Sequence, residues 1–190
     1  MENNLLRSMS EPTRRNSERK ISEVGNGKTL SEEQTKALPV SNGMNPPRKT
    51  VDKRFAKDEK YHGVLSQIEK AGVCPFCPEN FLWHTEPILR REGSWFITKN
   101  FRPYQNSQHH FMLISTAHKE KFSEITPEDW ANLGALINWT VNEYKILGGA
   151  LAMRFGETSY TGSTVCHLHA HVIVPQIENG KSKTVNFPIG

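Results

Sequence analysis

Two stretches of the chain carry apolar residues at the spacing of an amphipathic helix. The first predicts a helix over about 57–71, followed by Gly72 in the position of a C-cap. Its apolar positions are Val64, Leu65, Ile68 and Ala71. The second predicts a long helix over about 127–147, because Thr126 can cap its first turn and Pro127 suits the first helical position. Its apolar stripe, which should lie on a sheet, consists of Trp130, Leu133, Leu136, Ile137, Val141 and Tyr144.

Short apolar runs between and after these helices predict strands. Residues 87–98 have the pattern of a hairpin with a turn at Glu92 and Gly93, and a polar loop over 99–109 follows. Further strands are expected over 111–114, 150–155 and 164–174, with a short edge strand over 184–187. Strands at hairpin spacing beside one long helix predict an α+β fold, a mainly antiparallel sheet of about five strands with the helix packed on it.

The first 54 residues differ in composition from the remainder. They contain no aromatic residue and are rich in Ser, Asn, Glu, Lys, Arg and Pro. Such a segment cannot bury enough apolar surface to offset the entropy lost on ordering. We therefore predict a disordered basic tail over 1–54 and a single domain over 55–190, with its core over 72–176.

The formal net charge of +4 lies entirely in the first 60 residues, which hold 13 Lys and Arg against 9 Asp and Glu. Residues 61–190 hold 11 of each, so we expect no specific nucleic acid partner for the domain. Three cysteines without a secretory leader argue against a disulfide framework, and no run approaches the roughly 18 apolar residues that span a membrane. We expect a soluble cytoplasmic protein with no membrane partner.

Histidine occupies every second position at the centre of the predicted strand 164–174. Because successive side chains of a strand point to opposite faces, His167, His169 and His171 share one face at intervals of about 6.5 Å. A lone histidine is usually a hydrogen-bonded core residue, but three in a row on one face have no obvious packing purpose. The pattern favours a metal site, a phosphate or nucleophile site, or one whose histidines serve both tasks.

Cys74-Pro75-Phe76-Cys77 is a CxxC motif. Two thiolates at this spacing can hold one metal ion, or they can oxidise reversibly. The redox alternative usually has a βαβ pattern behind the motif, and no such pattern follows here. A third alternative is a pair of cysteines without a special role.

These motifs, in this order, resemble the histidine triad family of nucleotide hydrolases and transferases. Residues 167–173 resemble the family signature, and residues 161–165 resemble the loop that leads into it. Residues 113–118 resemble the strand that ends in the family's Pro-Lys-x-His turn, and the CxxC motif lies where zinc-bearing members carry theirs. The resemblance covers about residues 72–176.

The resemblance implies a role for each matched residue. His169 would be the nucleophile that attacks the α-phosphorus and forms a covalent nucleotidyl-histidine intermediate. His171 and Thr164 would hold the phosphate, and Asn100 would contact the ribose. The remaining matched positions are His167, which would orient the catalytic strand, and the nucleotide-binding loop residues Gly162 and Ser163, the second standing where the family has glutamine.

The resemblance also implies a structural zinc ion bound by Cys74, Cys77, His118 and His167. Two thiolates and two imidazoles make a closed tetrahedral site, which stabilises structure and leaves no open position for chemistry. His84, seven residues after Cys77, remains an alternative ligand. His109 and His110 are expected to be loop residues near the site.

The leading functional prediction is a nucleotide-binding hydrolase that cleaves a nucleoside phosphoramidate or a dinucleoside polyphosphate at its α-phosphate. One alternative is a nucleotidyltransferase or phosphorylase that uses the same intermediate. The third histidine of the triad is His171, where the uridylyltransferase branch of the family typically has glutamine, so the resemblance favours hydrolysis over transfer. A different class is a non-catalytic, zinc-stabilised nucleotide-binding module. A homodimer is expected from the resemblance alone.

Overall fold

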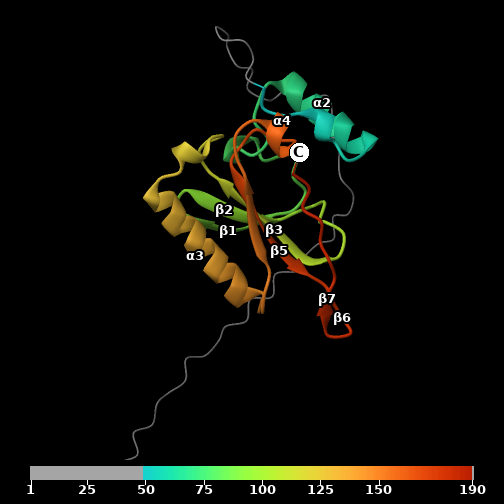
Figure 1. Cartoon of the computed structure of the whole chain (residues 1–190). Coiled ribbons are helices and arrows are strands. Elements are labelled where there is room, and N and C mark those ends of the chain that lie inside the picture. The colour runs from blue at the N-terminus through green and yellow to red at the C-terminus, as the bar shows by residue number, and fades with distance from the viewer. Residues whose placement is uncertain (1–48, 190) are drawn as a thin grey trace, which may run out of the picture.

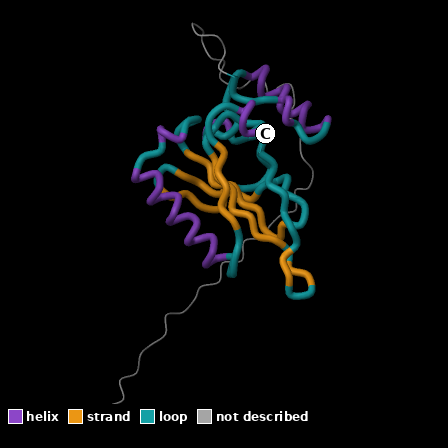
Figure 2. Tube along the Cα trace, viewed as in Figure 1, coloured by secondary structure: helices purple, strands orange, loops and turns teal. Residues whose placement is uncertain are grey.

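The sheet of the protein is antiparallel and has the spatial order β1-β2-β3-β5-β4 (Figures 1 and 2). The computed structural model describes residues 49–189, so most of the predicted tail lies outside the described residues. The strands of this sheet are β1 Ile88–Glu92, β2 Trp95–Lys99, β3 Ser107–Ser115, β4 Ala150–Arg154 and β5 His169–Pro175. The predicted α+β fold with a five-stranded antiparallel sheet and one long helix is confirmed.

Helix α3, Pro127–Glu143, covers one face of the sheet (Figure 1). Thr126 caps its first turn as predicted, and the Asp129 side chain caps it reciprocally. The main core lies between helix and sheet and includes Trp95, Ile97, Phe111, Leu113, Leu133, Leu136, Leu168, Ala170 and Val172. The helix ends four residues before the predicted 147, because Lys145 adopts a left-handed backbone with φ of 51°.

The remaining helical elements are shorter than α3. Helix α2, Glu59–Ala71, starts two residues later than predicted, because the Asp58 side chain caps it by accepting from the Tyr61 amide. The other short elements are η1 Lys53–Phe55, η2 Pro78–Asn80, η3 Phe122–Glu124 and α4 Thr158–Thr161. No helix among residues 49–189 is both long and apolar enough to cross a membrane.

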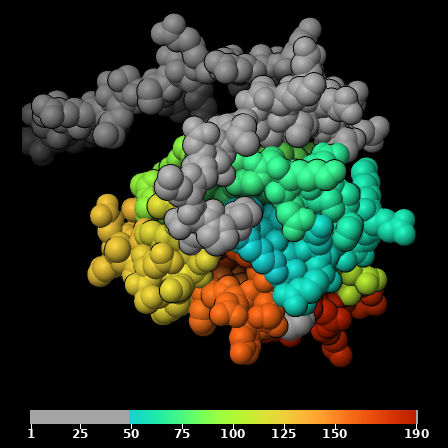
Figure 3. All heavy atoms as spheres, turned by 90° about the horizontal axis from the view of Figure 1, so that it is seen from above, coloured from blue at the N-terminus to red at the C-terminus, as the bar shows by residue number. Residues whose placement is uncertain are grey.

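The segment before α2 belongs to the folded domain, which corrects the predicted boundary at residue 54. Val51 forms an antiparallel bridge with Val165, and the Asp52 amide donates to the Thr164 carbonyl. Asp52 is 2% exposed, and its carboxylate accepts hydrogen bonds from Arg54, Lys49 and Thr158. Figure 3 shows this segment, in cyan, beside the orange segment that contains α4.

Three strand predictions differ from the structure. β3 begins at Ser107, inside the predicted loop 99–109, because the ladder with β5 continues to that residue. β5 begins at His169, so His167 precedes the regular ladder instead of belonging to it. Residues 184–187 form no strand; the chain makes two-residue strands, β6 Ile177–Glu178 and β7 Lys181–Ser182, and then runs back toward α4 (Figure 1).

Candidate active site

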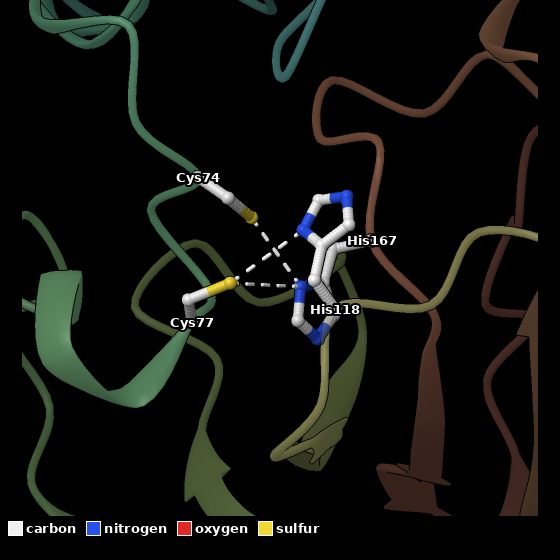
Figure 4. A group of neighbouring side chains, drawn as sticks. All are labelled: Cys74, Cys77, His118 and His167. Carbon is white, nitrogen blue, oxygen red and sulfur yellow. Dashed lines mark hydrogen bonds between the residues drawn. The ribbon is translucent and has the colours of Figure 1, made fainter. Parts of the chain in front are cut away.

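Four predicted metal ligands from three segments come together beside the sheet (Figure 4). These residues are Cys74, Cys77, His118 and His167, and we call them the metal group. Their ligand atoms all lie within 4.8 Å of one another. The cysteines precede η2, His118 follows β3 and His167 precedes β5. The CxxC turn is tight, with the Cys77 amide donating to the Cys74 carbonyl, which brings both sulfurs to the same side.

The distances within this group fit a tetrahedral zinc ion. The Nδ1 atom of His167 lies 3.3 Å from the Cys74 sulfur and 3.8 Å from the Cys77 sulfur, and Nδ1 of His118 lies 3.5 Å from the Cys77 sulfur. Tetrahedral Zn–S and Zn–N bonds of about 2.3 and 2.0 Å require S···N separations of about 3.5 Å. The donor set and its spacing therefore suit zinc.

The outer nitrogens of both histidines are held in the way that metal-binding imidazoles require. Nε2 of His167 donates to the Ser115 carbonyl at 2.7 Å, and Nε2 of His118 lies 3.0 Å from the Glu120 carboxylate. These bonds place the protons on Nε2 and leave each Nδ1 free to coordinate. A hydrogen bond from the Cys74 thiol lowers the pKa of the Cys77 thiol well below its ordinary value.

His84 is not part of the metal group. The alternative prediction, in which His84 is a metal ligand, is therefore wrong. Its Nε2 faces the Lys99 carbonyl at 2.9 Å and the Thr98 hydroxyl at 3.1 Å. Its ring stacks on Phe81 at 4.7 Å between centroids and meets the edge of Phe101 at 5.1 Å. Burial among these groups lowers the pKa of His84 to about 4.

A cavity of about 250 Å³ lies next to the metal group, on the sheet face opposite α3. His169 and His171 both line it. So do the four residues predicted to bind the nucleotide, Asn100, Gly162, Ser163 and Thr164. His167 does not line this cavity, which places it with the metal ligands and not with the groups that could touch a substrate.

His169 has the geometry of a nucleophile. Its Nδ1 donates to the carbonyl of His167 at 2.6 Å, so the lone pair of the neutral ring is on Nε2. Burial lowers its pKa to about 4, which keeps the ring neutral near pH 7. Phe76, from the CxxC turn, packs edge-on against this ring with 5.2 Å between centroids.

His110 controls the tautomer of His171, a connection that sequence reasoning missed. The Tyr104 amide donates to Nδ1 of His110, so the proton of this neutral ring is on Nε2. That nitrogen lies 2.9 Å from Nδ1 of His171, which must then accept. The proton of His171 is therefore on Nε2, which is buried and has no hydrogen-bond partner among the described residues.

The four predicted nucleotide-binding residues differ in the hydrogen bonds that their polar groups already form within the protein. Asn100 accepts from the Arg102 amide at 2.9 Å, and its side-chain nitrogen lies 3.2 Å from the His110 ring. The Thr164 hydroxyl is bonded to the Tyr61 hydroxyl at 2.8 Å. The Ser163 hydroxyl donates to the Val165 carbonyl, so this side chain fixes the loop. Gly162 ends α4 in a left-handed conformation with φ of 65°.

Cations and aromatic rings complete the cavity, and no local motif identified them. Lys57 precedes α2, Arg102 lies between β2 and β3, and Arg154 ends β4. Tyr104 lines the cavity and stacks on His110 at 4.6 Å between centroids. Phe187 stands behind this lining, with its ring centroid 5.4 Å from that of His171. These residues are spread over 131 positions of the chain, so only the fold brings them to His171.

No protein-family model matches the chain, and no curated protein matches it. Among solved structures, a Zn-bound histidine triad family protein from Mycobacterium smegmatis is 22% identical, with 60% of this chain and 83% of that chain covered and a TM-score of 0.44. A HIT family hydrolase from Clostridium thermocellum is 22% identical, with 57% and 94% covered and a TM-score of 0.44. A histidine triad nucleotide-binding protein from Candida albicans is 17% identical, with 62% and 85% covered and a TM-score of 0.47. Likenesses at this level do not identify an activity.

Proposed function

We propose that this protein is a histidine triad type nucleotide hydrolase that cleaves its substrate at the α-phosphate through a covalent nucleotidyl-histidine intermediate on His169. The observation that carries the proposal is the pairing of His169 and His171 in one cavity. The first ring has an unprotonated Nε2, and the second has a protonated Nε2 without a protein partner among residues 49–189. A lone pair beside a free donor is suited to attack on a phosphate ester.

In the proposed first step, Nε2 of His169 forms a bond to the α-phosphorus. The bond from phosphorus to the leaving group breaks, and the leaving group takes its electron pair. His171 donates from Nε2 to a phosphate oxygen, where negative charge increases as the reaction proceeds. In the second step water attacks the phosphorus, the N–P bond breaks, Nε2 regains its lone pair and the proton of the water passes to solvent.

We further propose that Cys74, Cys77, His118 and His167 hold a structural zinc ion, which when bound would cross-link the CxxC turn to the start of β5. Both ends of this cross-link touch the nucleophile. Phe76 packs on the His169 ring, and the His167 carbonyl accepts its Nδ1 proton. The zinc site would thus hold His169 in place and take no part in the chemistry.

The test is incubation of the purified protein with dinucleoside polyphosphates and nucleoside phosphoramidates that are radiolabelled at the α-phosphate. We expect turnover and an acid-labile phosphohistidine in the wild type. We expect neither in His169→Ala, with the melting temperature retained within a few degrees. Binding without turnover or label in the wild type would support the non-catalytic module, and turnover that requires inorganic phosphate would support a phosphorylase.

A further inference from the structure

Three cationic side chains from distant parts of the chain line the same cavity as His169 and His171. They are Lys57, Arg102 and Arg154. The charges of Lys57 and Arg154 also act on the His171 ring and lower its pKa further, beyond the effect of burial. The domain has almost balanced charge overall, so this local excess of positive charge is a property of the cavity.

Most of this positive charge is not neutralised. Arg102 forms an ion pair with Asp58, but neither Lys57 nor Arg154 forms one within the described part of the chain. Aromatic rings hold them instead: Nζ of Lys57 lies 4.3 Å from the centre of the Tyr104 ring, and the Arg154 guanidinium lies 4.5 Å from the centre of Phe187. Cation–π contacts fix the position of a cation and leave its charge available to an anion.

Arg154 also has a hydrogen-bond donor without a partner among the described residues. Its Nη2 donates to the Tyr104 hydroxyl and to the Pro188 carbonyl. Its Nε is buried and has no partner among residues 49–189, as is true of Nε2 of His171. Buried donors of this kind favour an incoming acceptor, and a guanidinium is suited to the oxygens of a phosphate group.

The chemistry of the leaving group decides what these cations can do. The α-phosphate needs one set of donors, which His171 and the loop at Gly162 can supply. A neutral amine leaving group gives further cations nothing to bind, whereas a phosphate chain carries additional negative charge away from the α-phosphorus. Cations beside the catalytic pair are therefore useful mainly for a leaving group that is itself a phosphate.

We propose that Lys57, Arg102 and Arg154 bind the leaving group, so that the substrate class is a nucleotide whose α-phosphate is linked to further phosphates rather than to an amine. This inference rests on the proposed function and narrows its two substrate classes to one. The bond that breaks is then the P–O bond of a phosphoanhydride. The leaving phosphate takes the electron pair as an anion, which the three cations stabilise.

The test compares dinucleoside polyphosphates with nucleoside phosphoramidates in pairs that share the nucleoside, for each of the four common ribonucleosides. For the pair that is turned over fastest, we expect kcat/KM of the wild type to favour the polyphosphate by at least tenfold. We expect Lys57→Gln and Arg154→Gln to reduce this ratio about tenfold each. Lys53→Gln is the matched control, because Lys53 pairs with Glu69 outside the cavity and should leave the ratio unchanged.

Equal or greater kcat/KM for the phosphoramidate in the wild type would overturn this inference and leave the proposed hydrolase intact. A wild-type preference for polyphosphate that neither Gln variant reduces would also overturn it. Turnover of neither substrate, with no label on His169, would overturn the proposed function itself. Since the first comparison uses only the wild type, the inference stays testable even if a variant does not fold.

Discussion

The proton on His171 is fixed by a chain of hydrogen bonds that begins at the backbone. The Tyr104 amide sets the tautomer of His110, and His110 sets that of His171. We expect His110→Phe to lower kcat roughly 10- to 100-fold, because an unfixed His171 can present an unprotonated Nε2 to the phosphate. His110→Gln restores an N–H donor and should recover part of the loss. Steady-state kinetics on both variants measure the effect.

The melting temperature separates the hydrogen-bonding role of His110 from a general packing role, in which the variants would lose stability together with activity. Phe keeps the stacking of this ring on Tyr104, so His110→Phe should retain the melting temperature within a few degrees. If His110→Phe and His110→Gln lost activity equally, the hydrogen bond to His171 would not be the reason for the loss. The intermediate on His169 should still form in both variants, only more slowly.

His84 gives the domain part of its pH dependence. Burial lowers its pKa to about 4 from an unfolded value near 6.5, so the unfolded chain binds a proton between these values and the folded chain does not. Proton binding to the unfolded chain lowers the unfolding free energy. This loss is absent above pH 6.5 and grows as the pH falls toward 4. Between pH 7 and pH 5 it amounts to roughly 2 kcal/mol of unfolding free energy.

His84→Gln should remove this penalty, since Gln can still hydrogen bond but does not titrate. Denaturant unfolding measures the fall in unfolding free energy between pH 7 and pH 5 for each protein. This fall should be smaller for the variant than for the wild type by roughly 2 kcal/mol. Protonation of the proposed cysteine and histidine metal ligands is common to both proteins and cancels in the difference. An equal loss in both would mean that His84 is not buried in its neutral form.

At the scale of single residues, the sequence was most informative where chemistry followed a local spacing. The CxxC motif and the alternate histidines are visible as patterns, and the structure brings Cys74, Cys77, His118 and His167 together as the resemblance implied. Lys57 and Arg154 belong to no motif and are ordinary surface residue types. Their proposed role depends on a cavity that exists only after strands distant in sequence have paired, so a single sequence could not identify them.

At the scale of elements, the CxxC turn packs against the start of β5. Phe76 packs against both His167 and His169. We expect Cys74→Ser, or removal of zinc by a chelator, to lower the unfolding free energy by about 3 kcal/mol or more, because metal binding is coupled to folding. Turnover should fall with it, since the support of His169 is lost. Metal analysis and thermal denaturation provide the measurement.

Cys166→Ser serves as the control for Cys74→Ser, because Cys166 is outside the metal group. It should keep stoichiometric zinc and the wild-type melting temperature. A Cys74→Ser protein that retained both its zinc and its melting temperature would contradict the proposed site. One that lost zinc but kept full stability would show that the cross-link does not support this part of the fold.

Element boundaries show where sequence patterns lose their information. The hairpin, the long helix and β5 follow from periodicity, which reports burial of one face. Residues 49–54 lack aromatic side chains and resemble a tail in composition, yet Val51 and Asp52 are buried. The carboxylate of Asp52 is stabilised by hydrogen bonds to Arg54 and to the distant Thr158, and such compensation has no periodic signature.

At the scale of the whole molecule, the sheet ends in β4, an edge strand with exposed apolar side chains beside it. Leu151 on β4 is 50% exposed, Leu147 is fully exposed, and Val141 of α3 is 37% exposed. An unprotected apolar edge favours pairing with another strand. A second copy of the chain can satisfy it symmetrically, since antiparallel pairing of β4 with its own copy obeys a two-fold axis. We therefore predict a homodimer formed through β4.

Light scattering should give about twice the chain mass of 21.6 kDa for the wild type. It should give the single-chain mass for Leu151→Lys, because this half-exposed side chain of β4 would be buried in the interface and an unpaired buried lysine is costly. Leu82→Lys is the matched control, since Leu82 is 55% exposed. It lies between η2 and β1, the strand at the other edge of the sheet from β4, so its replacement should leave the dimer intact. A monomeric wild type would contradict the prediction, and dissociation by Leu82→Lys as well would place the interface elsewhere. Because Arg154 lies on the same strand, a dimer through β4 would also hold the cation at the end of that strand firmly beside the cavity.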